Sequence, residues 1–229
     1  RYSERLRQLL IRDFRRSACW ALKDPRICRL LPWWKAVTGS LALDPRFLLV
    51  VRHPFEVAAS LQKRDGLSRE KSLILWLEHN LQAELHTRGA PRCVIGFDRL
   101  LADPTKELCR LEAELNLSFP IAVETAGNCI SESLIGDLRH HRTPPDNRAP
   151  MDQLERLATT LYQSLGIESV ELAGNQPSST VDDVRMQFEE YRRDFPPFLV
   201  EHIRSIDARR SEYNLAWLRV SRSWSWAPG

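Results

Sequence analysis

Residues 46–66 read RFLLVVRHPFEVAASLQKRDG, and this stretch carries the clearest fold signal in the chain. Its apolar run, residues 47–51, has no polar alternation, which is typical of a β-strand buried on both faces of a parallel sheet. Pro54 suits the first turn of a helix, and Gly66 suits its end. The stretch therefore predicts a strand followed directly by a helix, with Arg52 between them.

The same pattern continues downstream. Ser68 can cap a second helix, and residues 92–97 (RCVIGF) predict another buried strand. Asp103-Pro104 then predicts the start of a further helix. Strands separated by helical crossovers indicate an α/β fold in which helices flank a parallel β-sheet.

The ends of the chain differ from this central pattern. Residues 20–25 (WALKDP) predict a short strand that stops at Pro25, and a last helix is expected at Met151–Leu165. We expect an α/β domain over residues 1–173, a linker over 174–180 and a helical arm over 181–229 that leads toward a possible further domain.

The composition is that of a soluble globular protein. Hydrophobic residues make up 43% and charged residues 28% of the 229 positions, and the net charge of +3 gives no bulk preference for nucleic acid. The five cysteines form no C-x-x-C pair, so neither a disulfide framework nor a zinc site is indicated. With no signal-peptide core and no apolar span, we expect a cytoplasmic protein.

Arg52 is the first candidate for a ligand-binding residue. In an open parallel sheet, ligands bind beyond the carboxyl ends of the strands, where the next helix presents its N-terminus. The Arg52 guanidinium supplies several N–H donors there, and Ser60 supplies a hydroxyl eight residues later. The alternative is an arginine that only caps the strand in solvent and a serine that faces water.

The segment R-H-P-F-E-V-A-A-S-L resembles the 3′-phosphate-binding segment of sulfotransferases that use 3′-phosphoadenosine 5′-phosphosulfate (PAPS). Residues 97–117 resemble the strand-then-helix segment of that family, written Y-E-D-L…D-P…L-G. Residues 22–26 (LKDPR) are similar to its K-D-P segment, and residues 138–142 (LRHHR) to a segment of many bacterial members. These four segments occur in the family's order between about residues 20 and 142.

The resemblance implies a P-loop NTPase-like sulfotransferase fold and a role for each matched residue. Arg52 and Ser60 would bind the 3′-phosphate of PAPS, and Arg139 and Arg142 would close over the cofactor. Lys23 would lie near the sulfuryl group, where its ammonium favours the transition state. The alternative for Lys23 is a structural pair with Asp24. His140 or His141 would serve as a base, or else lie in a solvent-exposed loop.

One hallmark of the family is absent. Sulfotransferases carry a loop of the type G-x-x-R-S-G-T-S whose backbone N–H groups hold the 5′-phosphosulfate, whereas here Gly39-Ser40 is expected in a loop without the required strand or basic residue. Because the chain opens at Arg1 inside a helix, we expect a piece of a longer polypeptide; the alternative is a degenerate, non-catalytic member. These residues alone should have little sulfotransferase activity.

The predicted function is transfer of a sulfuryl group from PAPS, without a metal, to a hydroxyl acceptor, preferably a carbohydrate in bacterial surface polysaccharide synthesis. The C-terminal LRVSRSWSWAPG (218–229) resembles a segment found between modules of such synthesis proteins, which suggests a linked glycosyltransferase module; an exposed Trp-rich tail is the alternative. A nucleotide kinase would need G-x-x-x-x-G-K-[ST], which is absent. A non-catalytic nucleotide-binding or interaction module is the third possibility.

Overall fold

The structure is a computed structural model that describes residues 2–17, 19–137, 152–166 and 178–193. The chain divides into two compact units, residues 1–185 and residues 186–229. The fold and the site described below belong to the first unit. The predicted domain boundaries at 173 and 180 stay predictions.

Two strands and a larger set of helices make up the described residues. In chain order these are α1 (Tyr2–Phe14), α2 (Ile27–Gly39), β1 (Phe47–Val51), α3 (Pro54–Asp65), α4 (Arg69–Thr87), β2 (Arg92–Gly96), α5 (Phe97–Ala102), α6 (Pro104–Leu115), α7 (Val123–Asp137), α8 (Gln153–Ser164) and α9 (Ser178–Arg193). β1 and β2 are parallel, and their register runs from Phe47 opposite Arg92 to Val51 opposite Gly96. The α/β class is therefore confirmed, with a small parallel sheet in a mostly helical unit.

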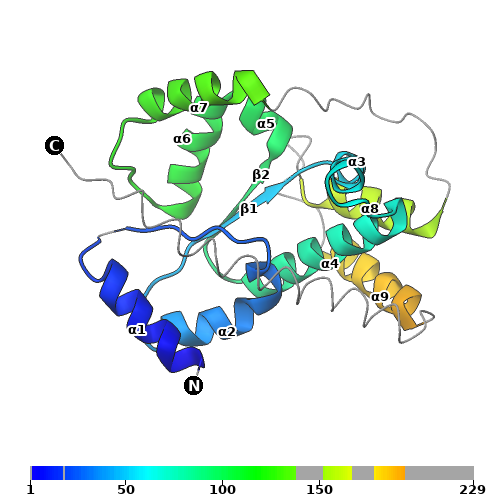
Figure 1. The fold of residues 1–229 in the computed structure, drawn as a ribbon, viewed down its shortest axis with the longest axis horizontal. Helices are drawn as coiled ribbons and strands as arrows, with labels where there is room; N and C mark the ends of the chain where they lie inside the picture. Colours follow the sequence, from blue (N-terminus) through cyan, green and yellow to red (C-terminus); the bar gives the residue numbers. More distant parts are fainter. Residues whose placement is uncertain (1, 18, 138–151, 167–177, 194–229) are drawn as a thin grey trace. The chain divides into compact units, whose positions relative to one another are not determined.

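The chain crosses from β1 to β2 through α3 and α4, as a parallel connection requires. α4 contacts β1, whereas α6 contacts β2. Figure 1 shows α6 and α7 on one side of the two strands and α2 and α4 on the other. α4 therefore packs against one strand and α6 against the other, and α4 also contacts α2, α3 and α8.

The helix ends form where the sequence predicts them. The Ser68 hydroxyl accepts a hydrogen bond from the backbone N–H of Lys71 at 3.3 Å, which caps α4. The Asp103 carboxylate does the same for α6 by accepting from the backbone N–H of Lys106 at 3.0 Å. Gly66 ends α3 with a φ of 66°, a left-handed conformation that glycine adopts without strain.

The core is centred on α4 and extends to β2 and α8. A first set of fully buried apolar residues lies on α4 and α8: Leu73, Ile74, Leu77, Leu81, Leu154, Leu157, Ala158 and Leu161. A second set joins β2 to α6: Cys93, Ile95, Leu111 and Leu115. Both sets recur at strand or helix spacing, so each element turns one apolar face inward.

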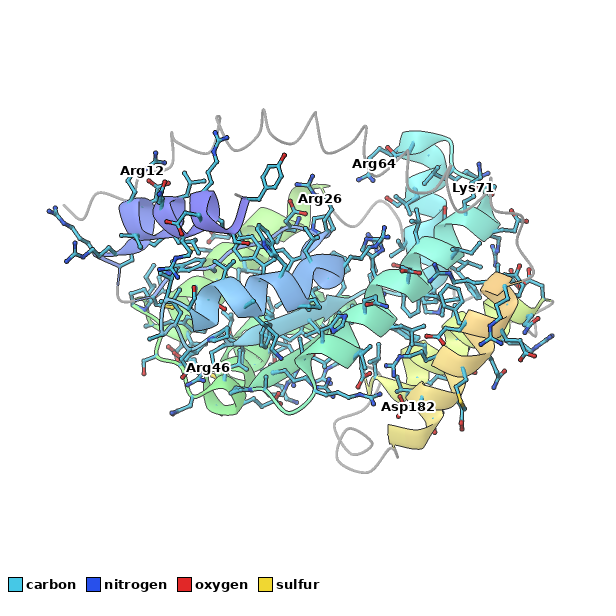
Figure 2. The ribbon with its side chains drawn as sticks, turned by 90° about the horizontal axis from the view of Figure 1, so that it is seen from below. Arg12, Arg26, Arg46, Arg64, Lys71 and Asp182 are labelled. Atoms are coloured by element: carbon cyan, nitrogen blue, oxygen red, sulfur yellow. The ribbon has the colours of Figure 1, made fainter. Side chains whose placement is uncertain are left out.

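Ion pairs add to this packing where the first half of α9 meets α4. Arg185 lies 2.9 Å from the buried Glu84 carboxylate, and Arg88 lies 2.8 Å from Asp182. Figure 2 shows Asp182 on α9. Arg88 also pairs with Glu84 at 2.7 Å, so one buried carboxylate organises the contact between two helices.

Four expectations about the elements were wrong. β1 is not buried on both faces, because the side chains of Leu48 and Val50 are 47% and 52% exposed. Residues 20–24 form no strand; Trp20 instead stacks on Phe14 at 4.6 Å between ring centroids. Gly39 is the last residue of α2 rather than a loop residue. Phe97 begins α5 instead of ending β2, and it thereby becomes available to the site.

None of the helices that the structure describes is long and apolar enough to cross a membrane.

Candidate functional site

The candidate site is the turn between β1 and α3. Because Val51 is paired with Gly96, Arg52 and Phe97 are the first residues after two neighbouring parallel strands, at the same edge of the sheet. The Arg52 guanidinium carbon lies 4.8 Å from the centroid of the Phe97 ring, within the range of a cation–π contact. The strand register therefore places an aromatic ring beside Arg52, the residue that is predicted to bind phosphate.

Two further contacts hold Arg52 in place. The Trp76 indole N–H donates a 3.0 Å hydrogen bond to the backbone oxygen of Arg52, which ties the turn to α4. The Arg52 Nε donates a 2.8 Å hydrogen bond to the Glu56 carboxylate. The side chains of Arg52 and Glu56 are 22% and 13% exposed, so solvent screens this ion pair only in part. Arg52 is thus oriented by α3, α4 and the start of α5.

The N-terminus of α3 faces the same turn. His53 is the N-cap residue and makes no side-chain capping bond, and Pro54 at the first helical position has no N–H group. The positive end of the helix dipole therefore adds to the charge of Arg52. The His53 ring packs edge-on against the rings of Phe55 and Tyr162, with centroids 5.2 Å and 5.0 Å away. The site is thus a turn in which Arg52, paired with Glu56, lies beside a helix N-terminus and aromatic rings.

Ser60 lies on α3, six residues after Pro54, which corresponds to about 9 Å along the helix axis. It is half-buried, and its hydroxyl has no hydrogen-bond partner in the part of the chain that the structure describes. Glu56 and Ser60 are four residues apart and share one face of α3. Along the chain, Glu56 therefore lies midway between Arg52 and Ser60, the two residues that are predicted to bind phosphate.

Lys23 lies apart from this turn in the connection between α1 and α2, and its side chain is exposed. Across the described ranges, no hydrogen bond or ion pair links Lys23 to Asp24 or to Arg52. The Asp24 carboxylate instead accepts hydrogen bonds from the Arg26 backbone N–H at 2.8 Å and from Arg26 Nε at 2.9 Å. The hydrogen bond from Arg26 holds the pKa of Asp24 below its usual value. Arg26 is thus the hydrogen-bonded partner of Asp24, and Lys23 contributes only a smaller charge attraction to the lowered pKa of Asp24.

The remaining predicted residues, Arg139, His140, His141 and Arg142, fall in residues 138–151, outside the described part of the chain. Their predicted roles stay predictions. Among the residues that are described, no group of three His, Cys, Asp or Glu side chains has the arrangement of a metal site.

Three residues that define the site were not among the predicted ones: Glu56, Trp76 and Phe97. Glu56 could have been found from its four-residue spacing after Arg52, which favours an ion pair at the start of a helix. The position of Phe97 beside Arg52 depends on the register between β1 and β2, which sequence patterns do not predict. Trp76 reaches Arg52 from α4 across 24 positions, and no local signal predicts that contact.

No protein-family model matches the chain, and neither a curated protein nor a solved structure matches it.

Proposed function

We propose that the turn between β1 and α3 binds the 3′-phosphate of PAPS, and that the chain contributes this half of a sulfotransferase site. The observation that carries the proposal is the oriented guanidinium of Arg52 beside the α3 N-terminus, where the N-cap residue His53 makes no capping hydrogen bond through its side chain. A fixed arginine loses little conformational freedom when a phosphate arrives, so more of the interaction energy appears as affinity.

The residues present fit the 3′-phosphate end of the ligand better than its sulfuryl end. Arg52 and the helix N-terminus supply positive charge, and Ser60 supplies a hydroxyl on the same helix. The loop motif that would hold the 5′-phosphosulfate is not in the sequence. We therefore propose strong binding of the nucleotide and low sulfuryl transfer by these residues alone.

The proposed reaction is sulfuryl transfer to a hydroxyl, with a carbohydrate as the acceptor class. PAPS supplies the activated sulfuryl group, whose bond to the phosphate oxygen breaks as the acceptor oxygen bonds to sulfur. A base takes the hydroxyl proton, and 3′-phosphoadenosine 5′-phosphate leaves. Lys23, if brought to the departing oxygen, would stabilise the negative charge that develops there. Arg139 and Arg142 keep their proposed role of closing over the ligand.

The finer fold assignment belongs to the same proposal. Two parallel strands connected through α3 and α4, with the anion site after the first strand, are compatible with a P-loop NTPase-like sulfotransferase fold. A non-catalytic nucleotide-binding module is the second candidate, and the missing phosphosulfate motif favours it. Both candidates require Arg52 for nucleotide binding, whereas only the enzyme transfers a sulfuryl group from PAPS to a sugar hydroxyl.

The test is calorimetric titration with 3′-phosphoadenosine 5′-phosphate. We expect Arg52→Ala to weaken binding about tenfold to a hundredfold, because a hydrogen bond to a charged group contributes about 1.5–3 kcal/mol. Arg64→Ala is the matched control: Figure 2 shows Arg64 near Lys71, where α3 passes to α4, and its partner is the adjacent Asp65 at 2.8 Å. Equal binding by the wild type and Arg52→Ala would contradict the proposal.

A further inference from the structure

The Glu56 carboxylate occupies one of the positions where a phosphate would contact Arg52. Its Oε2 atom lies 2.8 Å from Arg52 Nε, the geometry of a charge-assisted hydrogen bond. A phosphate oxygen is the same type of acceptor, so the Nε–H cannot serve both groups fully at once. A phosphate that binds through Arg52 Nε therefore has to displace the Glu56 carboxylate.

The place of Glu56 in the sequence adds to this conflict. Glu56 shares a face of α3 with Ser60 and is bonded to Arg52, so a phosphate that contacts both Arg52 and Ser60 has the Glu56 carboxylate as a neighbour. Only 13% of the Glu56 side chain is exposed, which limits the solvent screening between this carboxylate and a bound anion. Like charges this close oppose each other, and an anionic ligand must overcome that repulsion.

We propose that Glu56 is an internal competitor for Arg52 that sets the affinity and selectivity of the phosphate site. This inference rests on the proposed function of the β1–α3 turn. When the ligand binds, Arg52 exchanges the Glu56 carboxylate for a phosphate oxygen, and the Glu56 side chain turns away. A ligand with further contacts, such as the nucleoside of PAPS, overcomes the competition, whereas inorganic phosphate alone does not.

The central experiment uses Glu56→Gln, which removes the charge and keeps the shape of the side chain. We expect 3′-phosphoadenosine 5′-phosphate to bind about tenfold more tightly to this variant, because Arg52 no longer has to give up a charged partner when the phosphate binds. Inorganic phosphate should bind measurably to Glu56→Gln and not to the wild type. Glu70→Gln is the matched control, since Glu70 also lies in the first turn of a helix but has no contact with Arg52 among the described residues.

Two further variants keep the result decisive. In the double variant Arg52→Ala/Glu56→Gln, the gain in nucleotide affinity should be absent. The reason is that Glu56→Gln acts by freeing the Arg52 guanidinium for the ligand. Glu56→Ala, checked by its thermal unfolding, replaces Glu56→Gln if that variant fails to fold. Unchanged or weaker nucleotide binding in the Glu56 variants, while Arg52→Ala still weakens binding tenfold or more, overturns the competition and leaves the proposed function intact. A gain that survives in the double variant also overturns it.

Titration with inorganic phosphate distinguishes a failure of this inference from a failure of the proposed function. If the wild type and Arg52→Ala bind the nucleotide equally, the PAPS proposal fails. An Arg52-dependent gain of inorganic phosphate binding in Glu56→Gln would then still show that Glu56 competes for Arg52.

Discussion

At the scale of single residues, many of the described arginines pair with carboxylates, and Glu107 is the most buried of these carboxylates. Its side chain is 3% exposed and lies 2.6 Å from Arg99 and 2.7 Å from Arg110. Burial alone would raise the pKa of Glu107, but the hydrogen bonds from Arg110 and Arg99 outweigh it and hold the pKa below the usual value. This carboxylate therefore stays ionised in the folded protein.

We predict that Glu107→Gln destabilises the protein by about 3 kcal/mol near pH 7, since it leaves two arginines without their buried partner. Because the folded-state pKa lies below the unfolded value, the stabilisation by ionised Glu107 is present above about pH 4.5 and is lost as the pH falls through the folded-state pKa. The difference between wild type and variant should therefore shrink on acidification. Urea unfolding at pH 7 and at pH 3.5 measures both effects.

Glu114→Gln is the control for that experiment. Glu114 pairs with the same Arg110 at 2.6 Å, but its side chain is 40% exposed. An exposed pair contributes about 0–1 kcal/mol, so this variant should change the free energy of unfolding far less than Glu107→Gln. Equal effects of the two substitutions would show that burial does not set the contribution of these pairs.

At the scale of elements, local chemistry determined where helices begin and end, but not how deeply the strands are buried. Ser68, Pro104 and Gly66 act through neighbouring backbone groups, and the sequence therefore predicted the ends of α3, α4 and α6. The segment at residues 20–24 has strand-like composition, yet a strand forms only where another strand meets its backbone groups. α7 was not predicted at all, because its sequence has little amphipathic pattern.

The contact between α6 and α7 supports a prediction at this scale. A Cβ atom added at Gly127 would lie 2.2 Å from the Thr105 hydroxyl oxygen and 3.2 Å from the Thr105 Cα. Replacing a helical glycine with alanine gains about 0.5–1 kcal/mol, whereas overpacking costs about 1–3 kcal/mol. We therefore expect Gly127→Ala to lower the free energy of unfolding by about 1 kcal/mol.

Thermal or urea unfolding measures that change, and Gly39→Ala is its matched control. A Cβ at Gly39, the last residue of α2, meets no atom within 4 Å. Gly39→Ala should therefore be neutral or stabilising. Thr105→Ala should reduce the loss caused by Gly127→Ala, since it removes the nearest atom. A free energy of unfolding for Gly127→Ala equal to that of the wild type would contradict the close contact between α6 and α7 at Thr105.

At the scale of the whole molecule, the two strands and α6 enclose Cys93, while Cys19, Cys109 and Cys129 are exposed. Burial, with the hydrogen bond to Glu114, raises the pKa of Cys93 to about 12. Because the thiolate is the reactive form, Cys93 is protected both by packing and by protonation.

We predict that a thiol reagent at pH 8 modifies Cys109 quickly in the folded protein and reaches Cys93 only after unfolding. Mass spectrometry of digested protein, labelled with and without denaturant, measures both rates. In Cys93→Ala the number of labels on the folded protein should be unchanged. Labelling of Cys93 as fast as Cys109 under native conditions would contradict the packing of β2 against α6.

The sequence by itself determined the succession β1, α3, α4, β2, the capped ends of α3, α4 and α6 and the position of Arg52 after a strand, because these depend on residues close together in the chain. Only the tertiary structure decided that Phe97 and Trp76 hold Arg52, that Leu48 and Val50 are exposed and that Asp24 pairs with Arg26. Strand register and helix packing bring distant residues together, and side-chain geometry selects one partner among several charged neighbours. Patterns of neighbouring residues predict neither the contacts between distant residues nor the partner that a charged side chain takes.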